Sequence, residues 1–160
     1  MLLSLLRNPL LYIFVISMLP VVELRGAIPA AALLDIPFPV AYGLAVAGNM
    51  LPVPLLIPFA KRIILWLSHQ RYVGDFFTRF IHKADEKAKQ IGRYELLGLC
   101  LFVAVPLPGT GAWTGSVIAG ILRLRLLPAF LSIGAGVMIS GVIMGVISYG
   151  AAGLLDLLLI

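Results

Sequence analysis

Four long apolar segments make up most of this chain, and charged residues or prolines separate them. They cover residues 9–34, 38–60, 95–122 and 126–155, and a polar stretch at 61–94 divides the first pair from the second. An α-helix needs about 20 apolar residues to cross a bilayer, so each segment is long enough to reach through a membrane. The pattern predicts an all-α integral membrane protein.

The first and third segments are interrupted by residues that break helices. The first contains Pro20-Val-Val-Glu-Leu-Arg-Gly-Ala-Ile-Pro29, in which two prolines bracket Glu23 and Arg25. The third contains Val105-Pro-Leu-Pro-Gly-Thr-Gly-Ala-Trp-Thr-Gly115. Proline frees backbone groups from helical hydrogen bonds, and freed groups at membrane depth are tolerated only inside protein or beside water. We therefore expect each interrupted segment to be a re-entrant hairpin whose tip lies in a shared polar cavity.

The basic residues gather in the polar stretch. Residues 61–94 hold eight Lys or Arg side chains against three acidic ones, which accounts for the whole net charge of +5. The positive-inside rule places such a stretch in the cytoplasm. Two hairpins put Arg123 and Arg125 on the same side and leave only Arg7 in the outer flank, whereas four full crossings put Arg123 and Arg125 outside. The rule therefore favours hairpins.

These expectations combine into one membrane domain over residues 1–160. The first repeat covers 9–60, a basic amphipathic connector covers 61–94, and the second repeat covers 95–160. Each repeat is expected to be a hairpin plus one transmembrane helix, so the second repeat is inverted relative to the first. Inverted repeats place a transporter's binding site near the bilayer midplane, between the repeats.

Apolar residues recur at helical spacing within the connector. They are Phe77, Phe80, Ile81, Ala84, Ala88 and Ile91. A helix with this pattern suits the membrane interface, with its basic side toward lipid headgroups. A solvated connector is the alternative.

Small residues are frequent in the fourth segment, which contains the GxxxG pair Gly141-Val-Ile-Met-Gly145. Small residues let helix backbones approach closely in lipid. We interpret them as helix packing, and the face from Gly134 to Gly145 is the surface we expect in a homodimer.

Composition excludes several other classes. The chain is 61% hydrophobic and 12% charged, whereas soluble domains carry roughly 25% charged residues. No signal-peptide cleavage site follows the first apolar residues. The single cysteine, Cys100, excludes an internal disulfide. His69 and His82 lack metal-ligand spacing, and neither a nucleophile–base set nor a nucleic-acid motif is present. We expect no catalysis, cofactor, metal or nucleic acid.

Glu23 and Arg25 are the first candidates for a functional site. A charge at bilayer depth costs at least about 2.5–3.5 kcal/mol, so it usually faces a cavity or a partner. Glu23 would carry a proton or bind a cation, and Arg25 would bind an anionic group such as phosphate through its planar fork. The alternative is structural: a buried ion pair, or a carboxylate-to-backbone cap that holds the hairpin tip.

Further candidates lie in the second interruption and the second segment. The turn at Pro108-Gly-Thr-Gly111 would present backbone amides to an anion or simply form a tight turn. Trp113 would line a cavity or pack, and Asn49 would contact substrate or form an interhelical hydrogen bond. The residues expected to bind substrate or protons are Glu23, Arg25, Asn49, Pro108, Gly109, Thr110, Gly111 and Trp113.

The paired motifs Glu23-Leu-Arg-Gly-Ala-Ile-Pro29 and Pro106-Leu-Pro-Gly-Thr-Gly-Ala-Trp-Thr-Gly115 resemble those of the small multidrug export protein family, over nearly the whole chain. The layout is also similar to the wider DedA family. The first resemblance implies drug export in a prokaryotic plasma membrane. The second implies opposed re-entrant hairpins and transport of lipid-phosphate carriers or other lipids.

Three functions stay open at this point. The first is a secondary transporter of a small molecule or lipid-linked substrate, coupled to protons through Glu23. The second is a lipid flippase or scramblase of DedA type, and the third is a membrane scaffold that transports nothing. The expected partners are membrane lipids, a small-molecule or lipid substrate, and a second copy of the chain.

Overall fold

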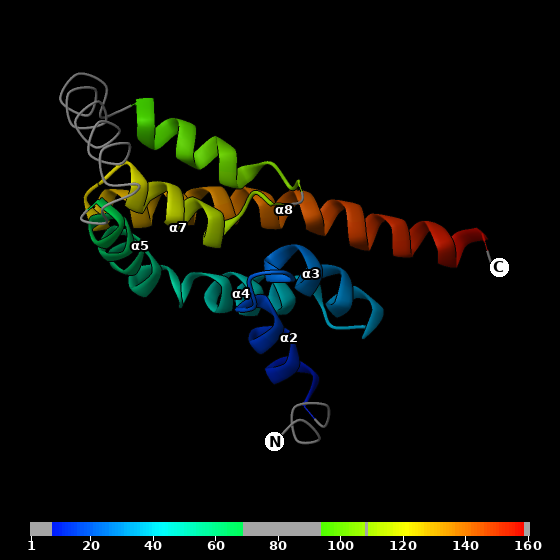
Figure 1. The fold of residues 1–160 in the computed structure, drawn as a ribbon. Coiled ribbons are helices and arrows are strands. Elements are labelled where there is room, and N and C mark those ends of the chain that lie inside the picture. Colours follow the sequence, from blue (N-terminus) through cyan, green and yellow to red (C-terminus); the bar gives the residue numbers. More distant parts are fainter. Residues whose placement is uncertain (1–7, 69–93, 108, 159–160) are drawn as a thin grey trace.

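The computed structural model describes residues 8–68, 94–107 and 109–158, and these form α-helices and turns without a strand. The labelled helices are α2 (Pro9–Ser17), α3 (Glu23–Leu33), α4 (Phe38–Met50), α5 (Val53–Ser68), α7 (Ala112–Ile121) and α8 (Leu126–Leu158) (Figure 1). A further short helix covers Tyr94–Ala104. The all-α prediction is confirmed for these residues. The predicted interfacial helix of the connector lies outside them.

The first apolar segment folds as two short helices, α2 and α3, which pack on each other. The side chain of Asn8 caps α2 by accepting a hydrogen bond from the Leu10 amide at 3.1 Å. Pro20 lies in the turn that follows α2, as predicted. Pro29 does not end a helix, contrary to our expectation, because α3 continues through it to Leu33. Proline removes one donor from a helix, and the burial of α3 against its neighbours offsets that loss.

The third apolar segment is divided in the same way. The helix Tyr94–Ala104 ends, a loop follows, and α7 begins at Ala112. Gly109 in this loop has φ +84°, a conformation that favours glycine. The Thr110 hydroxyl lies 2.7 Å from the Val105 carbonyl oxygen and 2.9 Å from that of Leu107, which closes the turn.

Two helical stretches are long and apolar enough to cross a membrane, among the residues described. They are Phe38–Ile63, which joins α4 to α5, and Leu126–Ala151 within α8. The first is bent where Leu51 and Pro52 separate α4 from α5. The second and fourth apolar segments therefore form the predicted long helices, and the order of two short helices and one long helix occurs twice.

The two halves pack on each other reciprocally. Helix α3, from the first half, packs on the long helix α8 of the second half. Helix α7, from the second half, packs on α5 of the first, and α4 contacts α8 (Figure 1). Short helices of one half thus cover the long helix of the other.

The small residues of α8 are used in this packing. A side chain at Gly136 would overlap Val103, one at Gly141 would overlap Tyr42, and one at Gly145 would overlap Phe38. The packing interpretation is therefore confirmed. The face that we predicted for a dimer contact is covered by the chain's own helices, which corrects that choice of surface. A dimer through another surface stays a prediction.

Candidate functional site

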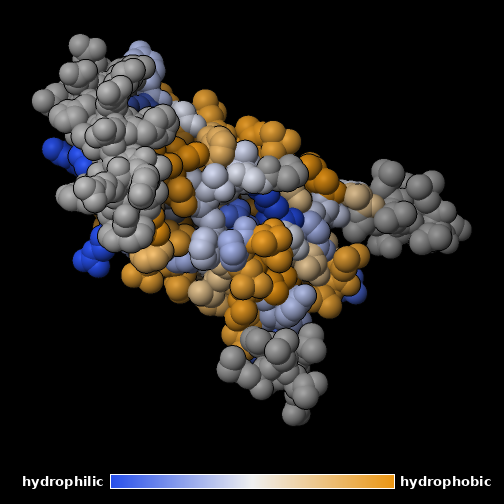
Figure 2. Space-filling model, in the orientation of Figure 1, coloured by the Kyte–Doolittle hydropathy of each residue, from blue (hydrophilic) through white to orange (hydrophobic). Residues whose placement is uncertain are grey.

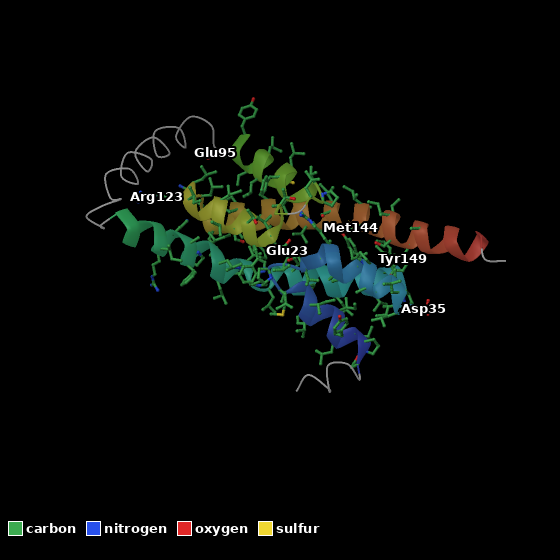
Figure 3. All side chains as sticks on the ribbon, turned by 45° about the vertical axis from the view of Figure 1, so that its right-hand side comes forward. Glu23, Asp35, Glu95, Arg123, Met144 and Tyr149 are labelled. Carbon is green, nitrogen blue, oxygen red and sulfur yellow. The ribbon has the colours of Figure 1, made fainter. Side chains whose placement is uncertain are left out.

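Glu23 lies in the middle of the molecule, at the first residue of α3 (Figure 3). Its side chain is buried, with 6% of its surface exposed. Its φ is +50°, a conformation that non-glycine residues seldom adopt. The backbone changes direction here, where the segment after α2 leads into α3. The carboxylate therefore contacts the second half of the chain.

The Glu23 carboxylate caps the N-terminus of α7. Its Oε1 accepts a hydrogen bond from the Trp113 amide at 3.1 Å, and the Ala112 amide also acts on the carboxylate. Gly111 lies directly against it, since a methyl group at Gly111 would overlap Oε2. Helix N-termini carry free amides and a partial positive charge, so they bind carboxylates.

Arg25 binds the end of the helix that precedes the interruption. Its guanidinium donates to the carbonyl oxygens of Val103 at 3.3 Å and Val105 at 3.1 Å, and to that of Leu107. The last carbonyls of a helix have no partner within it and carry partial negative charge. Arg25 therefore binds free carbonyls at the end of the helix before the interruption, while Glu23 binds a free amide at the start of α7, the helix after it.

This arrangement answers two of the open alternatives about the charged pair. Of the two structural interpretations of Glu23, the carboxylate-to-backbone cap is the one that its contacts show. The amides that bind the Glu23 carboxylate belong to Ala112 and Trp113, which follow the Pro108–Gly111 sequence that we considered for an anion. Glu23 and Arg25 can still contact a ligand, because both side chains also line a cleft.

The cleft opens where the two interruptions meet, and its volume is about 460 Å³. Its walls are Pro20, Val21, Val22, Glu23, Arg25 and Gly26 from the first interruption, Pro106, Leu107, Gly109, Thr110 and Thr114 from the second, and Met144 from α8. Figure 2 shows hydrophilic residues near the centre of a face that is otherwise largely hydrophobic. A polar cleft with apolar walls is typical of small-molecule sites, which measure about 300–1,000 Å³.

A narrower space, here called the inner cavity, shares Glu23 and Arg25 with the cleft. Its walls are Glu23, Leu24, Arg25, Asn49, Val103, Gly111, Ala112, Val137 and Ser140, and it is too narrow to hold a water molecule. Asn49 is 3% exposed and Ser140 is 2% exposed. The Asn49 Oδ1 and Ser140 Oγ atoms have no hydrogen-bond partner in the part of the chain that the structure describes. The interhelical hydrogen bond that we considered for Asn49 is therefore not formed by its oxygen.

Trp113 joins the two interruptions but lines neither space. Its indole nitrogen donates to the Met18 carbonyl at 3.0 Å, at the end of α2, and its backbone amide binds Glu23. Of our two interpretations of Trp113, packing is the one that these contacts favour.

The other predicted residues divide between the two spaces. Gly109 and Thr110 line the cleft, while Gly111 and Asn49 line the inner cavity. Pro108 lies outside the described residues. Sequence reasoning missed Thr114, Met144 and Ser140. Ser140 is one of the small residues of the fourth segment, which we interpreted together as packing residues, and its buried hydroxyl without a partner among the described residues distinguishes it.

Comparison with known proteins agrees with this architecture at the level of the family. The model of a family described as putative small multi-drug export protein matches residues 23–143, which begin at Glu23 and include both interruptions. Searches of curated proteins and of solved structures gave no match. Because the matched region is well over half of the chain, and two of its helices are long and apolar enough to span a bilayer, this membrane protein belongs to the small multidrug export family.

Proposed function

We propose that this protein is a secondary transporter that exports a small molecule and is coupled to protons through Glu23. The observation that carries the proposal is the position of Glu23. It is a buried carboxylate at the junction of two interrupted helical segments, on the wall of a cleft that is open to ligands. Interrupted helices that meet at a polar site are the usual construction of secondary transporters.

The proposed topology has two re-entrant hairpins in inverted repeats. The helices on either side of each interruption, such as α2 and α7, are too short to cross a bilayer of about 30 Å at 1.5 Å per residue. Reciprocal packing of α3 on α8 and of α7 on α5 supports the inverted arrangement. The basic connector would lie in the cytoplasm of a prokaryotic cell.

The cleft suits a small amphipathic molecule better than a whole lipid. Its volume is about 460 Å³, within the range of small-molecule sites. Glu23, Arg25 and Thr114 supply polar contacts, while Val21 and Met144 supply apolar ones. A lipid translocase would need Arg25 for a phosphate headgroup, but three backbone carbonyls already occupy its guanidinium. A small-molecule exporter is therefore the better-supported function.

The test is transport by the purified protein in liposomes that contain a pH-sensitive dye. A panel of cationic drugs and lipid phosphates is added outside, and proton flux is measured for each. We expect flux that depends on a drug and is abolished by Glu23→Gln. Glutamine still offers an oxygen to the Trp113 amide, so this change removes the proton site while keeping the cap.

The matched control is Asp35→Asn. Asp35 is exposed at the end of α3, far from Glu23 (Figure 3). Its substitution removes the same charge, and asparagine tolerates the positive φ of this position. We expect normal flux in this variant. Ligand-dependent flux that survives Glu23→Gln would contradict the coupling role, and flux only with lipid phosphates would favour the lipid translocase.

A further inference from the structure

The inner cavity contains a chemical imbalance that the described contacts do not resolve. The Asn49 amide oxygen accepts hydrogen bonds and cannot donate them, and it is buried without a donor. The Ser140 hydroxyl beside the same space has no partner either. A buried polar atom without a partner costs roughly 1–3 kcal/mol, and native structures rarely keep two of them together without a function.

Water does not resolve the imbalance, because the inner cavity is too narrow for it. A metal cation is disfavoured as well, since Arg25 lines the same space. The missing donor must therefore come from a residue already on the wall. The Ser140 hydroxyl is one donor there, but it forms no hydrogen bond with Asn49 Oδ1 in this structure, which leaves a residue with a protonated carboxyl group. Glu23 is that residue, since its Oε1 is bound to the Trp113 amide and its carboxylate faces both the cleft and the inner cavity.

We infer that Asn49 and Ser140 form the receiving site for a protonated Glu23, whose carboxyl group already lies in the wall of the inner cavity, so that proton binding turns this group from the α7 amides toward the Asn49 oxygen without entering the space. The step is a simple protonation: a hydronium ion in the cleft transfers a proton to the carboxylate and becomes water, and the new O–H donates to Asn49 Oδ1. The neutral acid binds the amides of Trp113 and Ala112 more weakly than the carboxylate does. Asn49 and Ser140 are thus positioning residues for the proton.

The charges around Glu23 are consistent with this exchange. Among the described residues that line the two spaces, Arg25 is the ionisable group besides Glu23, and α4, α7 and α8 contribute neutral residues there. Arg25 stays on the carbonyls of the preceding helix in either state of Glu23. Protonation therefore breaks the contact between Glu23 and the N-terminus of α7, while Arg25 keeps its contacts with the carbonyls before the interruption.

This inference rests on the proposed proton coupling but is tested without transport. Infrared spectra of the full chain in lipid nanodiscs are recorded as the pH is lowered, and the carbonyl band of a protonated carboxylic acid is followed. The band that Glu23→Gln removes belongs to Glu23. We expect Asn49→Leu to weaken proton binding by about tenfold, which lowers the midpoint by about one pH unit, and Ser140→Ala to lower it less.

The matched control is Ser116→Ala. Ser116 is a buried serine of α7, but its hydroxyl donates to the Ala112 carbonyl at 2.6 Å and does not line the inner cavity. We expect an unchanged midpoint. As a second measurement, the fluorescence of Trp113 in a Trp66→Phe background should change with the same midpoint, because the Trp113 amide loses its carboxylate partner.

An unchanged midpoint in both Asn49→Leu and Ser140→Ala overturns the inference, and so does the absence of any Glu23 band. If Asn49→Leu does not fold, Ser140→Ala and the Trp113 signal decide the question. Shifted midpoints in a protein that moves no protons would keep the receiving site and reject the proposed transporter. Glu23-dependent flux with unshifted midpoints would keep the transporter and reject the receiving site.

Discussion

At the scale of single residues, the contact between Gly111 and Glu23 determines how closely the two interruptions approach. Any side chain at Gly111 would occupy the place of the carboxylate. Gly111 itself is in an extended conformation that other residues adopt readily, with φ 170°. Glycine is therefore required here for space, and Gly109, with its positive φ, is required for conformation.

Replacement of Gly111 by alanine should displace the Glu23 carboxylate from the α7 amides. Loss of these buried hydrogen bonds should lower the free energy of unfolding by about 1–3 kcal/mol, measured as apparent thermal stability in detergent. Gly43→Ala is the control, because Gly43 lies in α4 with no atom near the position of the new methyl group. That variant should be as stable as the wild type or slightly more. Equal loss in both would show that the carboxylate contact is unimportant.

The guanidinium of Arg25 cannot be replaced by another cation. A lysine offers a compact point charge instead of a planar fork, so it cannot bind three separate carbonyls in the same geometry. We expect Arg25→Lys to destabilise the protein by about 1–3 kcal/mol. Arg125→Lys, at an exposed position before α8, should have little effect in the same measurement. Wild-type stability in Arg25→Lys would mean that charge alone is sufficient.

At the scale of elements, α7 is held at both ends by charges from the first half of the chain. Glu23 binds its N-terminus, and Lys61 of α5 donates to the Leu124 carbonyl just beyond its C-terminus. The acid is at the positive end of the helix dipole and the base is at the negative end, and each such placement is favourable. A buried helix of this length is marginal alone, so these contacts and its packing on α5 maintain it.

Removal of the lysine should loosen the C-terminal end of α7. We expect Lys61→Met, which keeps the length of the side chain, to lower stability by about 1 kcal/mol. Hydrogen exchange should increase in the last turn of α7 and stay unchanged in α8. Arg62→Met alters the exposed neighbour and serves as the comparison. Faster hydrogen exchange in all helices of both Lys61→Met and Arg62→Met would indicate general destabilisation and contradict a specific role of the Lys61 contact.

At the scale of the whole molecule, the positions of three polar residues test the proposed topology. Asp35 lies at one end of the molecule, and Glu95 and Arg123 lie toward the other (Figure 3). Two re-entrant hairpins therefore put Asp35 on one side of the membrane and the other two residues on the opposite side. Four full crossings would separate Glu95 from Arg123 and place Asp35 with Arg123.

Site-directed labelling distinguishes these topologies. Single cysteines are introduced at Asp35, Glu95 and Arg125 in a Cys100→Ala background, and whole cells are treated with a membrane-impermeant thiol reagent. We expect labelling at position 35 only, with positions 95 and 125 reacting after the membrane is opened. Labelling that separates positions 95 and 125 would contradict the hairpins.

The fold was predictable where hydrophobic patterning decides it. Apolar length identified both long helices, and residues that break helices, prolines above all, identified both interruptions. Pro29 was misjudged because sequence alone does not show that packing can offset one missing amide. The roles of Glu23 and Arg25 were predictable only as alternatives, since their partners lie far along the chain, at Trp113 and Val103. The role of Ser140 was not predictable, because it depends on the absence of a hydrogen-bond partner among the described residues, which only the three-dimensional structure shows.

The cap that Glu23 places on α7 also has a consequence during synthesis of the chain. The Trp113 amide follows Glu23 by 90 positions, and ribosomes add about 5–20 residues per second. For roughly 5–18 s, the nascent first half therefore carries an acid and a base with no backbone partners in the bilayer. A chain that stops before the second interruption keeps this defect permanently. Incomplete copies thus differ from complete ones by a carboxylate and a guanidinium that lack these backbone partners.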